Sequence, residues 1–258
     1  MDPVQLALAA VSGGLVSLLL TVFGGGGSVL AVPLLLYVVG VRDPHVAIGA
    51  SAAGVALNAL TGLVGHARDG RVKWPCALTF AGFGVLGALA GSSLAKTVDG
   101  QSLLIFFAGA MAVVGAAMLR PVRNEGDLDA RITLRMTPML AASGVGVGAA
   151  SGFFGIGGGF LIVPGLTAAT GMTLAAAQAS SLVSVAAFGA TTSLNYAASG
   201  LIDWAIVTAM TVGGVGGAIA GRPLAARLAD RAPLARRLFA GLILIVAAYV
   251  AARALTGG

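Results

Sequence analysis

The sequence predicts an all-α, polytopic integral membrane protein made of two inverted-topology repeats of five hydrophobic segments, with discontinuous or re-entrant helices at two glycine-rich motifs. Of its 258 residues, 58% are hydrophobic and only 9% are charged, whereas soluble domains carry about a quarter of charged residues. The stretch Phe23–Pro33 reads FGGGGSVLAVP, and Phe154–Pro164 reads FGIGGGFLIVP. A chain this apolar has more apolar surface than one globular core can bury, so it belongs in a lipid bilayer.

Apolar runs between charged residues divide the chain into ten segments, most of them long enough to cross about 30 Å of hydrocarbon. Asp43, Thr173 and Asp203 supply N-cap side chains at segment starts, and Pro138 supplies an early helical proline. The ten segments are about 4–22, 28–40, 46–66, 75–95, 101–119, 138–154, 159–171, 174–198, 204–224 and 236–254. The second and seventh hold thirteen residues each, roughly 20 Å of helix, which is too short for a full crossing. The first and second segments, and likewise the sixth and seventh, therefore either both cross the membrane or both enter it and turn back.

The two halves of the chain repeat one another. With an offset of 131 residues Pro33 matches Pro164, and with an offset of 130 Trp74 matches Trp204. We interpret this as a duplication that produced an N-terminal membrane repeat, a charged cytoplasmic linker and a C-terminal inverted membrane repeat. These three parts cover residues 1–122, 123–137 and 138–258.

Basic residues alternate between the loops. The third, fifth and ninth loops hold 12 of the 15 lysines and arginines, and cytoplasmic loops of membrane proteins carry such an excess. Both termini are therefore predicted to lie in the periplasm. Each repeat makes five or three crossings, an odd number, so the second repeat is inverted relative to the first. The charges thus indicate topology, and the chain has no soluble basic face that would bind nucleic acid.

No acid, lysine, arginine or histidine lies in the middle of a segment. A proton-relay pump or a cation transporter normally keeps an acid at mid-membrane, so both classes are disfavoured. Asp203, at a segment end, is interpreted as a helix cap, with a place in a cavity as the alternative. The single cysteine, Cys76, excludes an internal disulfide and a multi-cysteine metal site. We expect neither a cofactor nor a metal.

Uncharged polar side chains remain inside the segments and concentrate in the third and the eighth, which correspond in the repeat. Each serine or threonine alone can simply bond its own backbone or a neighbouring helix. As a set, these side chains predict a polar lining that donates hydrogen bonds to a substrate. The predicted donors are Ser51, Asn58, Gln178, Ser181 and Asn195.

The glycine runs are predicted to form the substrate site. Their backbone N–H groups stay unsatisfied in the membrane unless a ligand accepts them. Each run is expected to open a short helix, at Ser28 or Gly159, whose positive end attracts an anion. The alternative is that the glycines only allow tight packing, as in Gly87–Gly91 and Gly217–Gly221, two Gly-x-x-x-Gly stretches that suit internal packing and a homodimer seam equally. The predicted site residues of the runs are Gly24, Gly25, Gly26, Gly27, Ser28, Gly155, Gly157, Gly158 and Gly159.

Two enzymatic interpretations are disfavoured. A nucleotide-binding loop at Gly155–Gly159 would need an acid about 20 residues later or a Gly-Lys-Ser/Thr sequence, and the chain has neither. An intramembrane serine hydrolase would need a histidine at the depth of its serine, and His45 and His66 both lie at helix edges. We therefore expect no enzymatic activity.

At these residues the sequence resembles the TauE/SafE sulfite-exporter family, also called the toluene-sulfonate uptake permease family. The resemblance rests on the pattern F-G-x-G-G-G/S-x-L-x-V-P near the start of each half. Ser51, Ser180, Ser181, the turns at Gly70 and Gly200, and the basic central linker fit it too. It covers essentially the whole chain and implies an integral inner-membrane carrier for small anions, especially sulfite, sulfoacetate and other organosulfonates.

Together these features predict a bacterial inner-membrane secondary transporter, an exporter of a small sulfur-containing or carboxylic anion, that alternates access as its repeats rock. Ser28 replaces Gly159, and Gly25 stands opposite Ile156, so the two half-sites are not expected to be equivalent. The alternatives are a carrier for another small organic acid or a zwitterion, and a non-transporting membrane assembly factor. The expected partners are the substrate anion, the lipid bilayer and, as an option, a second copy of the chain.

Overall fold

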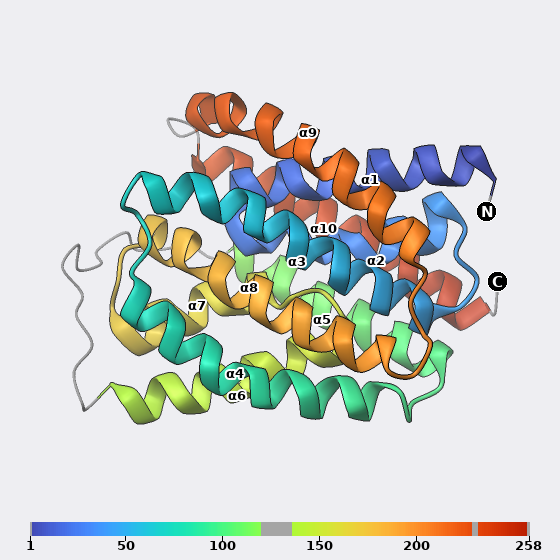
Figure 1. Ribbon diagram of the computed structural model, residues 1–258, viewed down its shortest axis with the longest axis horizontal. Helices are drawn as coiled ribbons and strands as arrows, with labels where there is room; N and C mark the ends of the chain where they lie inside the picture. The colour runs from blue at the N-terminus through green and yellow to red at the C-terminus, as the bar shows by residue number, and fades with distance from the viewer. Residues whose placement is uncertain (1, 120–135, 229–231, 257–258) are drawn as a thin grey trace.

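The computed structural model describes residues 2–119, 136–228 and 232–256, which form a bundle of helices (Figure 1). The described residues contain no β-strand, so the predicted all-α class is confirmed. The long helices are α1 (Pro3–Phe23), α3 (Pro44–Arg68), α4 (Trp74–Ala95), α5 (Gly100–Leu119), α6 (Thr137–Phe154), α8 (Leu174–Ala197), α9 (Trp204–Leu228) and α10 (Ala232–Thr256). The predicted linker 123–137 lies outside the described residues except for its last two positions.

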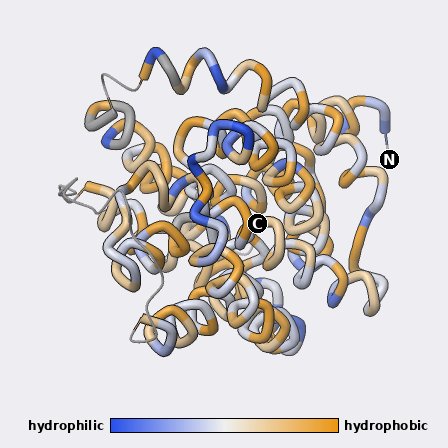
Figure 2. The backbone as a smooth tube through the Cα atoms, turned by 60° about the vertical axis from the view of Figure 1, so that its left-hand side comes forward, coloured by the Kyte–Doolittle hydropathy of each residue, from blue (hydrophilic) through white to orange (hydrophobic). Residues whose placement is uncertain are grey.

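Seven of these helices are long and apolar enough to cross a membrane, namely α1, α3, α4, α5, α8, α9 and α10. α6, with 18 residues, is not among the seven. The apolar helices Gly26–Val39 and Leu161–Thr170 are shorter, as predicted for the second and seventh segments. In Figure 2 the helices are mainly orange and white, and the blue hydrophilic stretches gather in connections and at helix ends. The protein is a multi-pass membrane protein.

The predicted start signals do begin helices. The Asp43 carboxylate accepts a hydrogen bond from the His45 N–H over 2.8 Å at the start of α3. Asp203 accepts one from the Ala205 N–H over 2.9 Å at the start of α9, which confirms its interpretation as a helix cap. A carboxylate at this position satisfies N–H groups that have no partner within the helix.

Two pairs of parallel helices pack backbone to backbone on opposite sides of the molecule: α1 lies along α9, and α4 lies along α6 (Figure 1). A Cβ atom added to Gly213 or Gly217 of α9 would overlap the carbonyl oxygen of Ala10 or Gly14 on α1. The Gly87–Gly91 stretch of α4 meets carbonyl oxygens of α6 in the same way. Of the two roles left open for the Gly-x-x-x-Gly stretches, internal packing is the one that the structure shows.

The helix pairs α3–α8 and α5–α10 run antiparallel. Tyr196, near the end of α8, lies against Gly49, near the start of α3. Gln101 Nε2, at the start of α5, donates a hydrogen bond to the carbonyl of Ala254, near the end of α10, over 2.7 Å. In each pair the partners are corresponding segments of the two repeats. In these two pairs, the segments that the sequence predicts to correspond therefore point in opposite directions.

Candidate functional site

The second glycine run forms a turn between α6 and α7 (Gly159–Thr170). Gly155, Gly157 and Gly158 have φ angles of +66°, +65° and +64°, a left-handed region in which a Cβ atom clashes with the backbone. The prediction that a short helix opens at Gly159 is confirmed. Three left-handed positions among the four residues 155–158 require glycine for backbone reasons, in addition to any packing reason.

This turn lies between the two central helices. Ser51 Oγ on α3 donates a hydrogen bond to the Gly155 carbonyl over 3.1 Å. A Cβ atom at Gly157 would be 2.9 Å from Val185 of α8 and 3.0 Å from Val55 of α3. The glycine turn is therefore held by α3 and α8 at once, in the interior of the bundle.

The second glycine turn contains backbone N–H groups that no backbone carbonyl accepts within the described residues. Leu161 and Ile162 both donate to the carbonyl of Gly158, over 2.8 and 3.0 Å. Within the described part of the chain, the N–H groups of Gly157 and Gly158 have no backbone partner. The helix α7, 12 residues long, brings its positive dipole end to the same place. This arrangement suits an oxygen that accepts hydrogen bonds and carries negative charge.

The predicted helix start at Ser28 is wrong. A 3-10 helix, η1, already begins at Gly24 and runs to Leu30. It continues into α2 (Ala31–Pro33) and then into the π-helix η2 (Leu34–Val39). Ser28 therefore lies inside a continuous helical segment, and only the second run opens a helix at the predicted residue.

The first run stays helical because its glycines let it turn tightly onto α1. Gly24 has a φ angle of +67°, and a Cβ atom at Gly27 would overlap the backbone of Leu20 in α1. Ser28 is fully buried in this contact, and its carbonyl accepts a hydrogen bond from the Ala31 N–H. The absence of side chains thus serves close packing in the first run and left-handed backbone in the second.

The first run faces Gln178 of α8. A Cβ atom at Gly24 would be 3.1 Å from both the Cβ and the Cγ of Gln178. Ser181, one turn further along α8, donates its hydroxyl to the Gln178 carbonyl over 2.7 Å. The Gln178 side chain is partly exposed. Gln178 is therefore the residue with a side-chain amide that the structure places beside the first glycine run, in contact through its Cβ and Cγ.

The second run faces the corresponding position of α3. Gly155 lies against Ile48, and Ser51 donates to the Ile48 carbonyl over 3.0 Å. Ile48 and Gln178 are related by the repeat offset of 130 residues. In each half-site the first glycine of the run therefore packs against the corresponding residue of α8 or α3, but that residue carries an amide in one half-site and an apolar side chain in the other. They are not chemically equivalent.

Two predicted donors lie elsewhere. Asn58 lies between α1 and α9, where its Nδ2 is 3.5 Å from the Gly13 carbonyl and its amide contacts Gly214. Asn195, near the end of α8, accepts a hydrogen bond from Lys96 Nζ over 2.9 Å. The structure brings Ser51 and Gln178 to the glycine runs, and Ser181 bonds the Gln178 carbonyl. Asn58 and Asn195 join helices instead.

Several residues around the second run carried no signal of their own in the sequence. Ile48, Val55 and Val185 look like ordinary apolar helix positions, although Ile48 is identifiable as the repeat partner of Gln178. Ser151 lies beside Gly158, and its buried Oγ has no hydrogen-bond partner within the described part of the chain. An unpaired buried hydroxyl at this place is a further group that a polar ligand would satisfy.

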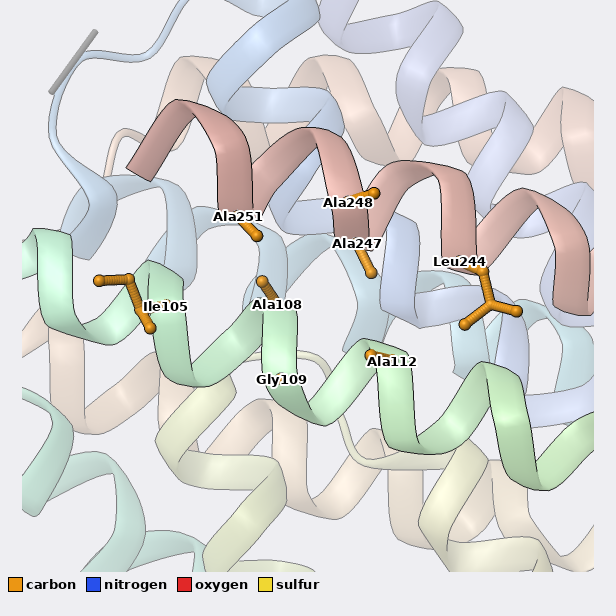
Figure 3. Close-up of a pocket in the computed structure, with 8 residues that line it drawn as sticks. All are labelled: Ile105, Ala108, Gly109, Ala112, Leu244, Ala247, Ala248 and Ala251. Carbon is orange, nitrogen blue, oxygen red and sulfur yellow. The ribbon is translucent and has the colours of Figure 1, made fainter. Parts of the chain in front are cut away.

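A cavity of 380 Å³ lies away from the glycine runs, between α5 and α10 (Figure 3). Its walls are apolar residues of those two helices, mainly alanines. They are Ile105, Ala108, Gly109, Ala112, Leu244, Ala247, Ala248 and Ala251. A cavity without polar groups cannot satisfy a charged ligand. The glycine runs themselves are closed in this structure, since Gly155, Gly157 and Gly158 are buried.

A polytopic helical bundle with helices that begin or change geometry inside it is the architecture of membrane transporters, and comparison with known proteins places the chain in that class. The profile of the family described as Sulfite exporter TauE/SafE matches residues 9–250. The chain therefore belongs to the TauE/SafE sulfite exporter family, as the sequence resemblance indicated, and it is a membrane transporter rather than an enzyme.

Curated relatives carry the same general description. A "Probable membrane transporter protein" of Xylella fastidiosa (strain 9a5c) is 49% identical over 240 residues, which cover 93% of this chain and 92% of the relative. The "Probable membrane transporter protein YdhB" of Bacillus subtilis (strain 168) is 25% identical over 201 residues, 77% of this chain and 80% of the relative. No solved structure matches the chain significantly.

Proposed function

We propose that this transporter exports small anions such as sulfite, sulfoacetate or other organosulfonates across the inner membrane by alternating access. The observation that carries the proposal is the second glycine turn, where the N–H groups of Gly157 and Gly158 and the start of α7 meet in the bundle interior. Sulfonate and sulfite oxygens accept hydrogen bonds and carry negative charge, so backbone donors and a helix start complement them without any cation. Gln178 adds a neutral side-chain donor.

The orientation of the two halves in the membrane is part of this proposal. Inverted repeats are supported by the antiparallel directions of α3 against α8 and of α5 against α10. In Figure 1 both chain ends lie at the right end of the bundle, whereas the α3–α4 connection, with Arg71 and Lys73, lies at the left end. The C-terminal part of α9, with Arg222 and Arg227, also lies at the left end. We place that basic end in the cytoplasm and both termini in the periplasm.

Export is favoured by the membrane potential. A potential negative inside drives one anionic charge outward with about 2.3 kcal/mol per 100 mV. Uncoupled export therefore needs no second ion, and within the described helices no aspartate or glutamate is present to bind a coupling proton. Purified protein in liposomes is expected to move sulfite along an imposed potential with equal inside and outside pH. Flux that ignores the potential and requires a pH gradient would contradict uncoupled export.

Binding itself is measured by thermal shift of the purified protein against sulfite, sulfoacetate, taurine, sulfate and simple carboxylates. Stabilisation by the sulfur oxyanions in proportion to their concentration is expected, because a ligand that binds only the folded state raises the unfolding temperature. A shift with carboxylates or taurine alone would assign the site to an organic acid or a zwitterion instead. No shift with any of them would refute the anion site.

We expect Gln178 variants to change affinity. In Gln178→Ala the loss of one hydrogen bond to a charged ligand weakens sulfoacetate binding roughly tenfold. Gln178→Glu keeps the size but places a negative charge beside the anion, so binding is lost. The control is Gln5→Glu, the same chemical change at the start of α1, where the side-chain oxygen accepts a hydrogen bond from the Asp2 N–H that a glutamate also accepts. Unchanged affinity in Gln178→Glu would remove this residue from the site.

A further inference from the structure

We infer that the units that move during transport are two three-helix bundles, each built from both halves of the chain; this rests on the proposed alternating access. The first bundle is α1, α3 and α9, and the second bundle is α4, α6 and α8. Rocking of the N-terminal repeat against the C-terminal repeat is what the sequence suggests. In Figure 1, however, α1 and α4, both from the N-terminal repeat, lie on opposite sides of the molecule.

Backbone contacts lock helices of different halves together. Gly217 of α9 lies on the carbonyl of Gly14 of α1, and Gly152 of α6 lies on the carbonyl of Ala88 of α4, with no room for a Cβ atom in either place. Helices in such contact cannot slide or separate without losing the packing of several turns at once. Because α1–α9 and α4–α6 each join one helix from each repeat, the repeats are interlocked and cannot rock as whole units.

The helix α3 is tied to the α1–α9 pair. Asn58 lies between Gly13 of α1 and Gly214 of α9, and a Cβ atom at Gly214 would overlap its amide. Further along α3, Gly65 lies against the guanidinium of Arg222 of α9, 2.9 Å from Nη2 to the place of a Cβ atom. These contacts place α3 in the first bundle. The contact of α3 with α8 across the seam is looser than the glycine contacts within the pairs, since a Cβ atom at Gly189 of α8 would be 2.8 Å from the Ala52 carbonyl oxygen.

The helix α8 is tied to α4 at both ends. Near the end of α8, Lys96 Nζ donates to Asn195 Oδ1 over 2.9 Å, and Asn195 Nδ2 donates to Ser92 Oγ over 2.7 Å. Near its start, Ser180 Oγ accepts a hydrogen bond from the backbone N–H of Lys73 over 2.9 Å. These bonds place α8 in the second bundle.

The ties are placed symmetrically in the two bundles. Ser92 and Arg222 correspond in the repeat, and so do Asn195 and Gly65, each pair with an offset of 130 residues. The contact of Ser92 with Asn195 in the second bundle thus has its counterpart in the contact of Arg222 with Gly65 in the first. Equivalent positions therefore serve to hold equivalent bundles together.

The glycine runs lie at the seam between the bundles. Gly155 follows α6 of the second bundle but contacts Ile48 of α3 in the first. Gly24 follows α1 of the first bundle but contacts Gln178 of α8 in the second. Movement of one bundle against the other therefore opens and closes these two contacts. An anion bound there would become accessible from alternate sides without any helix leaving its bundle.

The test measures distances between nitroxide labels on cysteines by pulsed electron resonance, in a Cys76→Ala background in liposomes. One pair is Val4→Cys in α1 with Ile219→Cys in α9, which joins different halves within the first bundle. The other pair is Val4→Cys with Leu86→Cys in α4, which lies within one half but joins the two bundles. The three side chains are 67%, 65% and 63% exposed, so the labels do not disturb packing.

We expect the Val4–Ile219 distance to stay constant and the Val4–Leu86 distance to shift or split, both when sulfoacetate is added and when a potential is imposed. The reverse result would show that the repeats move as units and would overturn the inference. A result in which neither distance changes overturns it as well. Ligand binding is measured separately by the thermal shift described above, so a failure of the anion site and a failure of the bundle assignment give different results.

Discussion

Replacing Gly158 with alanine is expected to abolish anion transport while the protein still inserts and folds. At a φ angle of +64° a Cβ atom costs about 1–2 kcal/mol. The same Cβ atom would lie 2.5 Å from the Ser151 Cβ, so the turn must also shift. The N–H groups of Gly157 and Gly158, which we assign to the anion, then no longer point toward it. Sulfite flux in liposomes measures transport, and the size-exclusion elution profile in detergent shows whether the variant is folded.

Gly171 provides a matched control for this substitution. It ends α7 with a φ angle of +69°, and no atom lies within 4 Å of the place of its Cβ. Gly171→Ala therefore carries the same backbone strain without a collision, and we expect it to keep most of the flux. The double variant Gly158→Ala/Ser151→Gly removes the collision and is expected to recover part of the transport. If Gly158→Ala transports as well as Gly171→Ala, the turn has no role in the passage of the anion.

The boundaries of the helices were predictable because charged residues and caps mark them. Asp43 and Asp203 stand where α3 and α9 begin, and the thirteen-residue seventh segment is α7. The partners of the helices were not predictable in the same way. A local sequence gives the apolar length of α1 but does not say that it packs on α9 rather than on a helix of its own half. That pairing depends on glycines of α9 that lie against the backbone of α1 in the folded protein, a contact that the sequence pattern does not reveal.

The candidate site was predictable where the repeat and the chemistry agreed. Ser51 and Gln178 lie at the glycine runs, whereas Asn58 and Asn195 bridge helices. An amide in an apolar helix can bond a neighbouring helix as readily as a ligand. The sequence alone therefore does not tell these two roles apart. The first glycine run shows the same ambiguity, since consecutive glycines permit both a 3-10 helix and a break. The sequence indicates an unusual backbone conformation at these glycines. The close contact of Gly27 with the Leu20 backbone favours the 3-10 helix over a break.

The second large effect that we expect concerns two glycines of α6 whose different roles the sequence does not reveal. Gly146 and Gly148 stand two residues apart in α6 and look alike in the sequence. A Cβ atom at Gly148 would overlap the carbonyl oxygen of Gly84 in α4, whereas no atom lies within 4 Å of the place of one at Gly146. Gly148→Leu therefore forces α4 and α6 apart along their length. Because the obstacle is backbone, no rotamer change relieves it.

For Gly148→Leu we expect a loss of about 3 kcal/mol, the upper part of the usual range for over-packing. That corresponds to a fall of roughly 6–12 °C in the unfolding temperature for a chain of this size. Gly146→Leu adds the same side chain to an exposed position and is expected to shift the temperature by less than about 2 °C. Thermal unfolding followed by size-exclusion chromatography in detergent measures both. Equal stability of the two variants would mean that α4 and α6 do not touch through Gly148. The close packing of α4 on α6, on which the bundle assignment rests, would then fail as well.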